Sequence, residues 1–220
     1  MIAGGGTGGH ITPALAFGEA LQQRYPQALL WYCGRPGSLE QTLVRQHGWA
    51  FKTVCSAPPR PGFARCWALA RIAWGLLQSV MLVLRFRPRL VVGFGGYTAF
   101  PLLLAALRLR RPVLVHEANA LPGRAVRALA RRGAWVAYGL SSDDADDALH
   151  ALARQLGTRA RRTGNPLRRA FLDATIEHAC RVTGLAADAP TVLVLGGSLG
   201  SRALNTLAPP ALEHVARAVP

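Results

Sequence analysis

Short apolar runs alternate with longer amphipathic segments along most of the chain. Apolar runs bounded by Gly, Pro or charged residues are typical of strands covered on both faces of a parallel sheet, whereas apolar positions three or four residues apart are typical of helices. The apolar runs comprise residues 28–33, 50–54, 89–92, 112–116 and 134–139, and the helical segments comprise residues 15–25, 38–47, 67–84, 99–109 and 122–132. This alternation predicts an α/β fold with a Rossmann-like, doubly wound parallel sheet.

The first residues carry a dense glycine cluster. Five glycines occupy positions 4 to 9, between a very short apolar segment and a helical one. Glycines let a ligand approach the backbone closely, and a helix N-terminus offers unpaired N–H groups and a positive dipole end to an anion. We therefore expect a phosphate-binding loop here.

His10 stands where the helix begins, and Pro13 suits the first helical turn. The dipole at a helix N-terminus disfavours an imidazolium, so we expect a neutral imidazole that can accept a proton. The alternative is a histidine that is satisfied within a structural turn.

The glycine spacing also matches the dinucleotide fingerprint, Gly4-x-Gly6-x-x-Gly9. That motif needs an acidic residue about 20 positions further on, at the end of the second strand. The expected second strand runs into Gly34-Arg35 instead. NAD binding is therefore disfavoured, and NADP binding through Arg35 remains an alternative.

The chain is strongly basic, with a formal net charge of +15 and Lys52 as its one lysine. From Arg60 to Arg132, thirteen arginines accompany one acidic residue, Glu117. Such a field attracts nucleic acid, an anionic membrane surface or a pyrophosphate-bearing substrate. Nucleic acid is disfavoured, because the arginines are not interleaved with the exposed aromatic platforms that such binding uses.

The cysteines and acidic residues indicate neither disulfides nor a metal. Four cysteines lie far apart, which predicts free thiols in a reducing compartment. No basic-then-apolar leader is present, so we expect a cytosolic protein.

Residues 141–147 contain an Asp-x-Asp pattern that holds a metal in some sugar transferases, but Ser141 followed by Asp144 favours a capped helix start. No cofactor is expected.

The most hydrophobic stretch runs from Trp67 to Leu84 and is interrupted by Arg71 and Gln78. It is long enough to span a membrane, but a mid-segment arginine costs about 2.5 to 3.5 kcal/mol on insertion scales. We expect a long helix packed on the sheet, whose other face is also suited to a membrane interface. The expected membrane patch comprises Phe63, Trp67 and Trp74 in the headgroup region and Arg65, Arg71 and Arg85 facing anionic lipid.

Polar residues follow two of the expected central strands. A second glycine loop, residues 93–97, ends in Tyr97, which is suited to bond a sugar or to anchor the turn. Glu117 and Asn119 follow the run 112–116, at the strand end where ligands of open α/β sheets bind. A carboxylate, an amide and an imidazole at this edge suit sugar hydroxyls and proton transfer better than DNA bases.

The pattern restarts near the C-terminus, where an apolar run over 191–195 precedes a third glycine loop and a helical segment over 202–219. One strand with one helix is not a domain, because the strand needs neighbours. We therefore expect a fragment, or a truncated reading frame, of a two-domain protein. Its expected parts are a Rossmann-like domain over 1–163, a crossover over 164–190 and the incomplete start of a second Rossmann-like domain over 191–220.

Five stretches together resemble the MurG family of peptidoglycan glycosyltransferases. They are AGGGTGGHITPALA at residues 3–16, GFGGYTAFP at 93–101, HEANALPG at 116–123, TGNPLR at 163–168 and LGGSLGSRALN at 195–205. The resemblance implies a GT-B fold, in which the first domain binds acceptor and membrane and the second binds the donor. It implies inverting transfer of N-acetylglucosamine from UDP-N-acetylglucosamine to the 4-hydroxyl of undecaprenyl-pyrophosphoryl-N-acetylmuramyl-pentapeptide, at the cytoplasmic face of the cell membrane.

The resemblance also implies roles for individual residues. His10 becomes the candidate general base, and Glu117 a second catalytic candidate at an acceptor-side position. The remaining roles are a phosphate loop at Thr7, Gly8 and Gly9, UDP-sugar contacts from Asn119, Arg168 and Ser198, and an acceptor side at Gly95, Gly96 and Tyr97.

Two positions depart from the family's pattern, with Leu199 in place of the usual Gln and Val126 in place of Asn. The family's uracil contacts and most of its sugar contacts lie in the second domain, so we expect the 220-residue chain alone to show no transfer. Two other functions stay open. One is a non-catalytic polyanion- or membrane-binding module, whose binding would collapse with salt and ignore His10, and the other is a GT-B transferase for another lipid acceptor.

Overall fold

A computed structural model describes residues 1–220 apart from 59–63, 141–147, 189–190, 197–199 and 219–220. The chain divides into two compact units, which we call unit 1 (Met1–Leu172) and unit 2 (Asp173–Pro220).

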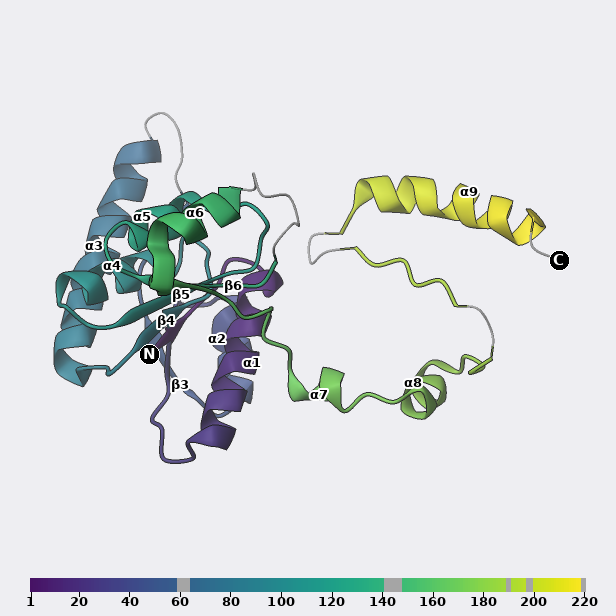
Figure 1. The fold of residues 1–220 in the computed structure, drawn as a ribbon, viewed down its shortest axis with the longest axis horizontal. Coiled ribbons are helices and arrows are strands. Elements are labelled where there is room, and N and C mark those ends of the chain that lie inside the picture. The colour runs from purple at the N-terminus through teal and green to yellow at the C-terminus, as the bar shows by residue number, and fades with distance from the viewer. Residues whose placement is uncertain (59–63, 141–147, 189–190, 197–199, 219–220) are drawn as a thin grey trace. The chain divides into compact units, whose positions relative to one another are not determined.

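Within the described residues, unit 1 is built on a seven-stranded parallel sheet (Figure 1). Its strands are β1 (Ile2–Ala3), β2 (Trp31–Gly34), β3 (Ala50–Thr53), β4 (Val91–Gly93), β5 (Val113–Glu117), β6 (Trp135–Tyr138) and β7 (Ala160–Arg162). Their spatial order is β3-β2-β1-β4-β5-β6-β7, and Ile2 of the short central strand lies opposite both Tyr32 and Val92. The order reverses beside β1, so the expected doubly wound sheet is confirmed.

Helices cover both faces of the sheet (Figure 1). One face carries α1 (Gly8–Arg24) and α2 (Leu39–Gln46), and the other carries α3 (Ala64–Phe86), α4 (Phe100–Arg108), α5 (Arg124–Ala130) and α6 (Ala148–Leu156). Successive strand residues supply opposite cores: Ile2 and Tyr32 pack under α1 and α2, and their neighbours Ala3 and Cys33 pack on the other side. Burial raises the pKa of the Cys33 thiol to about 12, so this cysteine is an inert core group.

α1 begins earlier than its hydrophobic pattern suggests. It includes Gly8, Gly9 and His10, and Pro13 therefore lies inside the helix rather than in its first turn. The Thr7 carbonyl accepts the His10 N–H at 3.1 Å, and this bond includes Gly8 and Gly9 in the first helical turn. Pro13 has no N–H to donate to the carbonyl of Gly9, so one helical hydrogen bond is absent there.

β7 is the strand that the hydrophobic pattern misses. Its residues Ala160-Arg161-Arg162 contain no apolar run, yet they pair with β6 at the edge of the sheet. The strand is continued by Thr163, whose N–H donates to the Tyr138 carbonyl at 3.0 Å. An edge strand has one neighbour and a partly solvated surface, so its sequence can stay polar. The short helix α7 (Arg169–Leu172) then ends unit 1.

Unit 2 contains α8 (Ile176–Thr183) and α9 (Arg202–Ala218), and its described residues form no strand. α9 corresponds to the helical segment expected after the third glycine loop. The strand expected over 191–195 is not formed, and Val192 and Leu193 are 69% and 74% exposed. The physical reason is the one that the sequence already indicates: an isolated strand has no partner for its backbone groups.

Candidate active site

The two N-terminal glycine loops meet at the switch point between β1 and β4. The Phe94 N–H donates to the Ala3 carbonyl at 2.8 Å, which aligns the two strand ends. Gly96 has a φ of +77° and lies so close to the Gly5 carbonyl oxygen that a side chain at position 96 would collide with it. Ligands of doubly wound sheets bind at this position, so the sheet places the predicted loops where a site is expected.

His10 packs against the second of these loops. A Cβ atom on Gly95, which has a φ of +85°, would lie 2.9 Å from Nδ1 of the imidazole. The residue is half-buried, and its Nδ1 atom is buried with no hydrogen-bond partner among the described residues. The alternative of a histidine satisfied within the turn therefore has no hydrogen bond at Nδ1 to support it, and the role of His10 as a general base stays a prediction.

Thr7, Gly8 and Gly9 form the entry to α1. Thr7 is extended (φ −143°) and its side chain makes no capping hydrogen bond. Among the described residues, no acceptor takes the N–H groups of Gly8 and Gly9, and both glycines reach the surface. Free N–H groups at the start of a 17-residue helix suit an anionic ligand.

Tyr97 closes the other side of the first glycine loop. A Cβ atom on Gly6 would lie 3.6 Å from Cε1 of its ring, and the guanidinium carbon of Arg35 lies 5.5 Å from the ring centroid. Beneath the loops, Glu40 is 1% exposed, and its Oε1 accepts the N–H of Arg35 at 3.3 Å. Glu40 belongs to the segment 38–47, which the sequence predicts only as a helix, and no local signal marks it as the carboxylate under the glycine loop.

The Glu117 carboxylate accepts hydrogen bonds from the loop that follows it. The carboxylate is 4% exposed; Oε1 accepts both the backbone N–H (3.0 Å) and the side-chain amide (2.8 Å) of Asn119, and Oε2 accepts the N–H of Gly123 (2.8 Å). This geometry makes Glu117 a positioning residue for the exposed Asn119 side chain, which lies at the carboxyl end of β5.

Replacing Glu117 by alanine is expected to lower the free energy of unfolding by about 1–3 kcal/mol, because the loop N–H groups lose their acceptor. Glu117→Gln keeps one acceptor oxygen and the side-chain volume, so it is expected to cost less. Urea denaturation of the 220-residue chain measures both. An alanine variant as stable as the parent chain would contradict the positioning role.

His116 ties the end of β5 to the segment after β7. Its Nε2 donates to the Gly164 carbonyl at 3.1 Å. Desolvation by burial lowers the pKa of His116, and the bond to Gly164 and the charge of Glu117 oppose this effect. The Nε2–H donor to Gly164 is present in both forms of the imidazole, and burial favours the neutral form.

The sign of this shift predicts a loss of stability on acidification. The unfolded chain binds the His116 proton near pH 6.5, above the folded pKa, so the stabilisation is complete above pH 6.5 and falls as the pH falls below it. Urea midpoints at neutral and mildly acidic pH are expected to differ more for the parent chain than for His116→Gln, which keeps a donor for Gly164. Equal pH dependence in the two proteins would refute this role.

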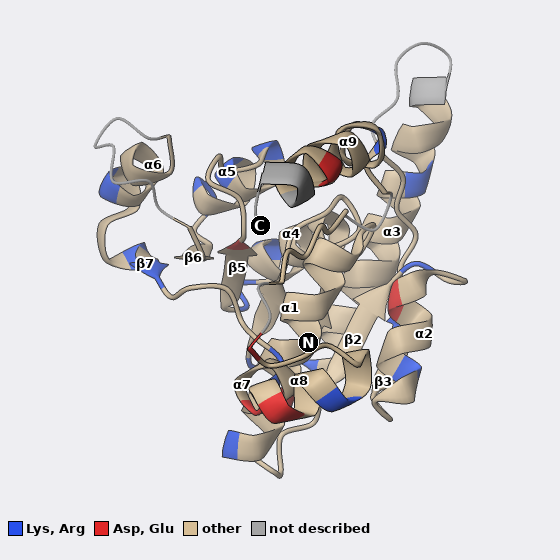
Figure 2. Ribbon diagram, turned by 90° about the vertical axis from the view of Figure 1, so that its right-hand side faces the viewer, with Lys and Arg blue, Asp and Glu red and all other residues tan. Residues whose placement is uncertain are grey.

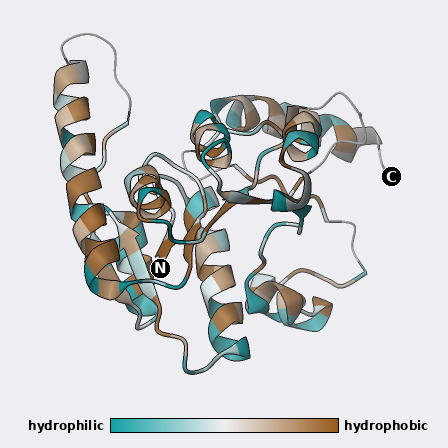
Figure 3. Ribbon diagram, turned by 60° about the vertical axis from the view of Figure 1, so that its left-hand side comes forward, coloured by the Kyte–Doolittle hydropathy of each residue, from teal (hydrophilic) through white to brown (hydrophobic). Residues whose placement is uncertain are grey.

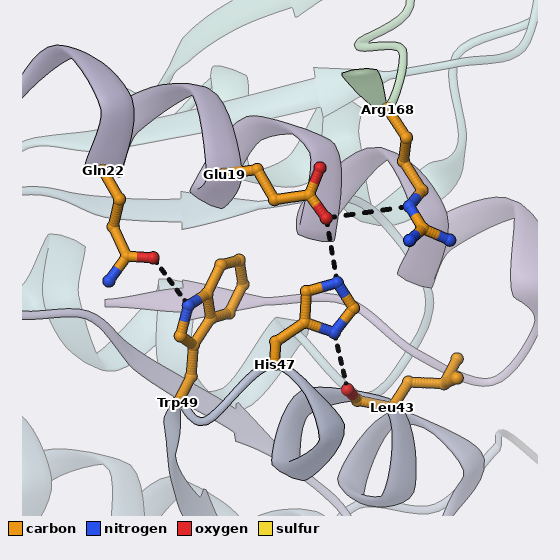
Figure 4. A network of polar contacts seen from close by, with 6 residues as sticks. All are labelled: Glu19, Gln22, Leu43, His47, Trp49 and Arg168. Atoms are coloured by element: carbon orange, nitrogen blue, oxygen red, sulfur yellow. Dashed lines mark hydrogen bonds and ion pairs between the residues drawn. The ribbon is translucent and has the colours of Figure 1, made fainter. Parts of the chain in front are cut away.

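Arg168 lies away from the glycine loops. It pairs with Glu19 of α1, with Nε 3.7 Å from Oε1, and the same oxygen lies 2.9 Å from Nε2 of His47 (Figure 4). His47 Nδ1 in turn donates to the Leu43 carbonyl at 2.8 Å. The Arg168 guanidinium thus holds the crossover segment on α1, and its contact with a UDP-sugar stays a prediction.

Other predicted site residues fall elsewhere. Ser198 and Leu199 lie outside the described residues, as does the 141–147 segment with its Asp-x-Asp pattern. Val126 is 4% exposed and belongs to the core between α5 and the sheet. Over the described ranges, no cluster of three His, Cys, Asp or Glu residues is arranged to hold a metal ion.

α3 presents an apolar face to solvent. Its inner face buries Ala68, Gly75 and Val83, whereas Trp67 and Trp74 are 69% and 52% exposed. The outer face also exposes Leu77, Met81 and Leu84, spaced three or four residues apart, together with Arg71 and Arg85.

Figure 3 shows the hydrophobic colouring along this helix, and Figure 2 shows basic positions on it. Phe63 and the side chain of Arg65 lie outside the described residues.

The helix is long and apolar enough to cross a membrane over Cys66–Phe86, with 22% of its most apolar window buried. Its inner face packs chiefly against α4, the Phe86 ring near its end contacts the Trp31 ring of β2, and the Cys55 N–H donates to Gln78 at 2.8 Å. Both expectations for this segment, a packed helix and an exposed apolar face with arginines, are therefore present in one element.

The sequence and the fold match known glycosyltransferases. Residues 1–137 match the glycosyltransferase family 28 N-terminal domain. A Desulforudis audaxviator protein named UDP-N-acetylglucosamine--N-acetylmuramyl-(pentapeptide) pyrophosphoryl-undecaprenol N-acetylglucosamine transferase is 39% identical over 97% of the chain, and a Clavibacter michiganensis protein of the same name is 40% identical over 93%. The crystal structure of Acinetobacter baumannii MurG aligns over 96% of the chain with a TM-score of 0.64 and 29% identity. The chain spans about half the length of these relatives, 56%, 54% and 53% respectively.

Proposed function

The chain belongs to glycosyltransferase family 28, and on this premise we propose that it forms the acceptor-binding part of an inverting N-acetylglucosaminyltransferase. The donor is UDP-N-acetylglucosamine and the acceptor is undecaprenyl-pyrophosphoryl-N-acetylmuramyl-pentapeptide, in keeping with the names of the relatives. The new bond forms to the 4-hydroxyl of the muramyl sugar.

The observation that carries the proposal is the unpartnered His10 imidazole beside the second glycine loop. As general base, His10 takes the proton of the acceptor hydroxyl while the oxygen attacks the anomeric carbon of the donor. The bond from that carbon to the UDP oxygen breaks on the opposite face, which inverts the configuration. UDP leaves with the bonding electron pair, and backbone N–H groups at helix ends stabilise its charge.

The supporting residues divide between the two substrates. Gly95, Gly96 and Tyr97 form the acceptor side, where Glu117 is a positioning residue for the Asn119 loop. Asn119, Arg168 and Ser198 contribute to the UDP-sugar site. The N–H groups of the Thr7, Gly8 and Gly9 entry bind a phosphate of the donor or of the acceptor.

We place the enzyme at the cytoplasmic face of the cell membrane as a peripheral protein. The exposed Trp67 and Trp74 supply apolar contact, and Arg71 and Arg85 supply attraction to anionic lipid. A lipid-linked acceptor would then be collected from the membrane surface. The same face also supports the second candidate, a membrane-binding module without catalysis, and the loops are equally suited to a transferase for another lipid acceptor.

The test is transfer of labelled N-acetylglucosamine from its UDP donor to the lipid-linked muramyl acceptor. The chain is assayed alone and joined to the C-terminal half of the Desulforudis audaxviator relative. Transfer by the joined protein and none by the 220-residue chain is the expected result. Lipid binding without transfer by the joined protein would favour the membrane module, and transfer only to a different lipid would favour the other acceptor class.

A further inference from the structure

The Glu19 carboxylate on α1 lies between two basic side chains from distant segments. Its Oε1 atom lies 2.9 Å from Nε2 of His47, at the end of α2, and 3.7 Å from Nε of Arg168, in the crossover after β7 (Figure 4). Neither Glu19 nor His47 has a role in the transfer described above, whereas Arg168 is the proposed contact to the UDP-sugar. We call these three residues the Glu19 cluster.

The hydrogen bonds of His47 fix the number of protons on its ring. Nδ1 lies 2.8 Å from the Leu43 carbonyl oxygen, which can only accept a hydrogen bond, so Nδ1 carries a proton. Nε2 lies 2.9 Å from the Glu19 oxygen. A neutral imidazole protonated at Nδ1 would direct the Nε2 lone pair at that carboxylate, which is repulsive. The two bonds together therefore require a second proton, and the pair is an imidazolium bonded to a carboxylate.

The position of His47 also favours a positive charge. The residue caps the C-terminus of α2, where the helix dipole presents its negative end. Across the described residues, the charged groups that meet the imidazole are Glu19 from α1 and, through Glu19, Arg168 from the crossover. On α2 itself Arg45 is exposed to solvent, and on the side of β3 the uncharged Trp49 ring lies 5.4 Å away. The proton on His47 is therefore coupled most directly to Glu19.

Arg168 is held in the Glu19 cluster by charge alone. The distance of 3.7 Å is too long for a hydrogen bond, and the buried Nε atom has no hydrogen-bond partner in the described structure. The side chain as a whole is 43% exposed, so its other atoms reach solvent, where an anion can meet them. Glu19 meanwhile divides its attraction between two cations. Loss of the His47 proton would leave the carboxylate to Arg168 alone, which strengthens the attraction between them.

We propose that Glu19 is a positioning residue for Arg168, and that the proton on His47 controls how strongly Glu19 holds it. The inference rests on the proposed function, because it takes Arg168 as the contact to the pyrophosphate of the sugar nucleotide. When His47 is protonated, Arg168 can leave Glu19 for the donor. When His47 is neutral, Glu19 retains Arg168 and donor binding weakens. By linkage, a donor that draws Arg168 away makes His47 bind its proton more tightly.

The first measurement follows the titration of the His47 ring by NMR in the 220-residue chain. In Arg168→Gln the titration midpoint is expected to rise by about half a pH unit, because Glu19 then pairs with the imidazolium alone. In Glu19→Gln it is expected to fall, because the carboxylate that stabilises the imidazolium is lost. Arg24→Gln is the matched control, since it removes an exposed positive charge from the end of α1. An equal rise in Arg24→Gln, or no rise in Arg168→Gln, would refute the coupling.

The second measurement is the dissociation constant for UDP-N-acetylglucosamine, determined by calorimetry on the chain joined to the C-terminal half of the Desulforudis audaxviator relative. Between about pH 6 and about pH 9 the constant of the parent protein is expected to increase about two- to fivefold, the scale of a partly exposed ion pair. Glu19→Gln and His47→Gln are expected to keep a nearly constant value, because each removes one partner of the proton-dependent bond.

The outcomes separate this inference from the proposed function. If the constant changed equally with pH in the parent and in both variants, the inference would be wrong and the transferase would stand. If the joined protein bound the donor as expected but transferred no sugar, the proposed function alone would be contradicted. A joined protein that bound no donor would refute both.

Discussion

Replacing His10 by alanine is expected to lower the rate of N-acetylglucosamine transfer by about 10²- to 10⁴-fold, the range that a positioned general base contributes. The imidazole lies against Gly95 with its Nδ1 atom unpartnered in the described structure, so no other hydrogen bond compensates for its removal. The measurement is the initial rate of the chain joined to the C-terminal half of a relative, at saturating donor and acceptor. Binding of the protein to vesicles that contain the lipid acceptor should change little, since the apolar face of α3 is untouched.

Two further variants separate proton transfer from structure. His10→Gln keeps hydrogen-bonding atoms but has no basic nitrogen, so it is expected to be as inactive as the alanine variant. Thr12→Ala changes an exposed side chain on the same helix and is expected to retain the parent rate. Substantial transfer by His10→Gln would show that His10 positions the acceptor and does not take its proton.

Replacing Gly96 by alanine is expected to lower the free energy of unfolding by about 2–5 kcal/mol. A left-handed backbone conformation costs a non-glycine residue about 1–2 kcal/mol, and forcing atoms into a packed site costs about 1–3 kcal/mol more. Both apply here, because Gly96 has a φ of +77° and a Cβ atom would strike the Gly5 carbonyl oxygen. Urea denaturation measures the change, and transfer should fall as well, since the two glycine loops are forced apart.

Gly37→Ala is the matched control. Gly37 also has a positive φ, +65°, but a Cβ atom there meets no atom within 4 Å. Its replacement is therefore expected to cost only the conformational part, about 1–2 kcal/mol. If the two variants were equally stable, the contact between the glycine loops would not contribute to the fold.

The strands and helices of unit 1 were largely predictable because their signals are local. A buried strand needs an apolar run, and β2, β4 and β5 each have one. The glycine loops were also predictable, since a close backbone approach requires glycine in the sequence itself. The edge strand β7 escaped prediction because one neighbour and a solvated surface impose no apolar pattern.

The candidate site was predictable in part. Strand ends of a parallel sheet share one edge, which is why His10, the second glycine loop and the Glu117 loop were all assigned to it. The use of each side chain was not readable from its neighbours in sequence. Glu117 bonds to its own loop, and Arg168 pairs with Glu19, which lies on a helix near the start of the chain.

The sequence by itself determined the α/β class, the glycine loops, the position of His10 and the amphipathic character of α3, because each depends on residues close together along the chain. Only the tertiary structure decided that Gly96 touches Gly5, that Glu40 lies beneath the first loop, and that Glu19 contacts both His47 and Arg168. Those contacts join distant segments, and the strand order that brings them together is set by packing both faces of the sheet at once.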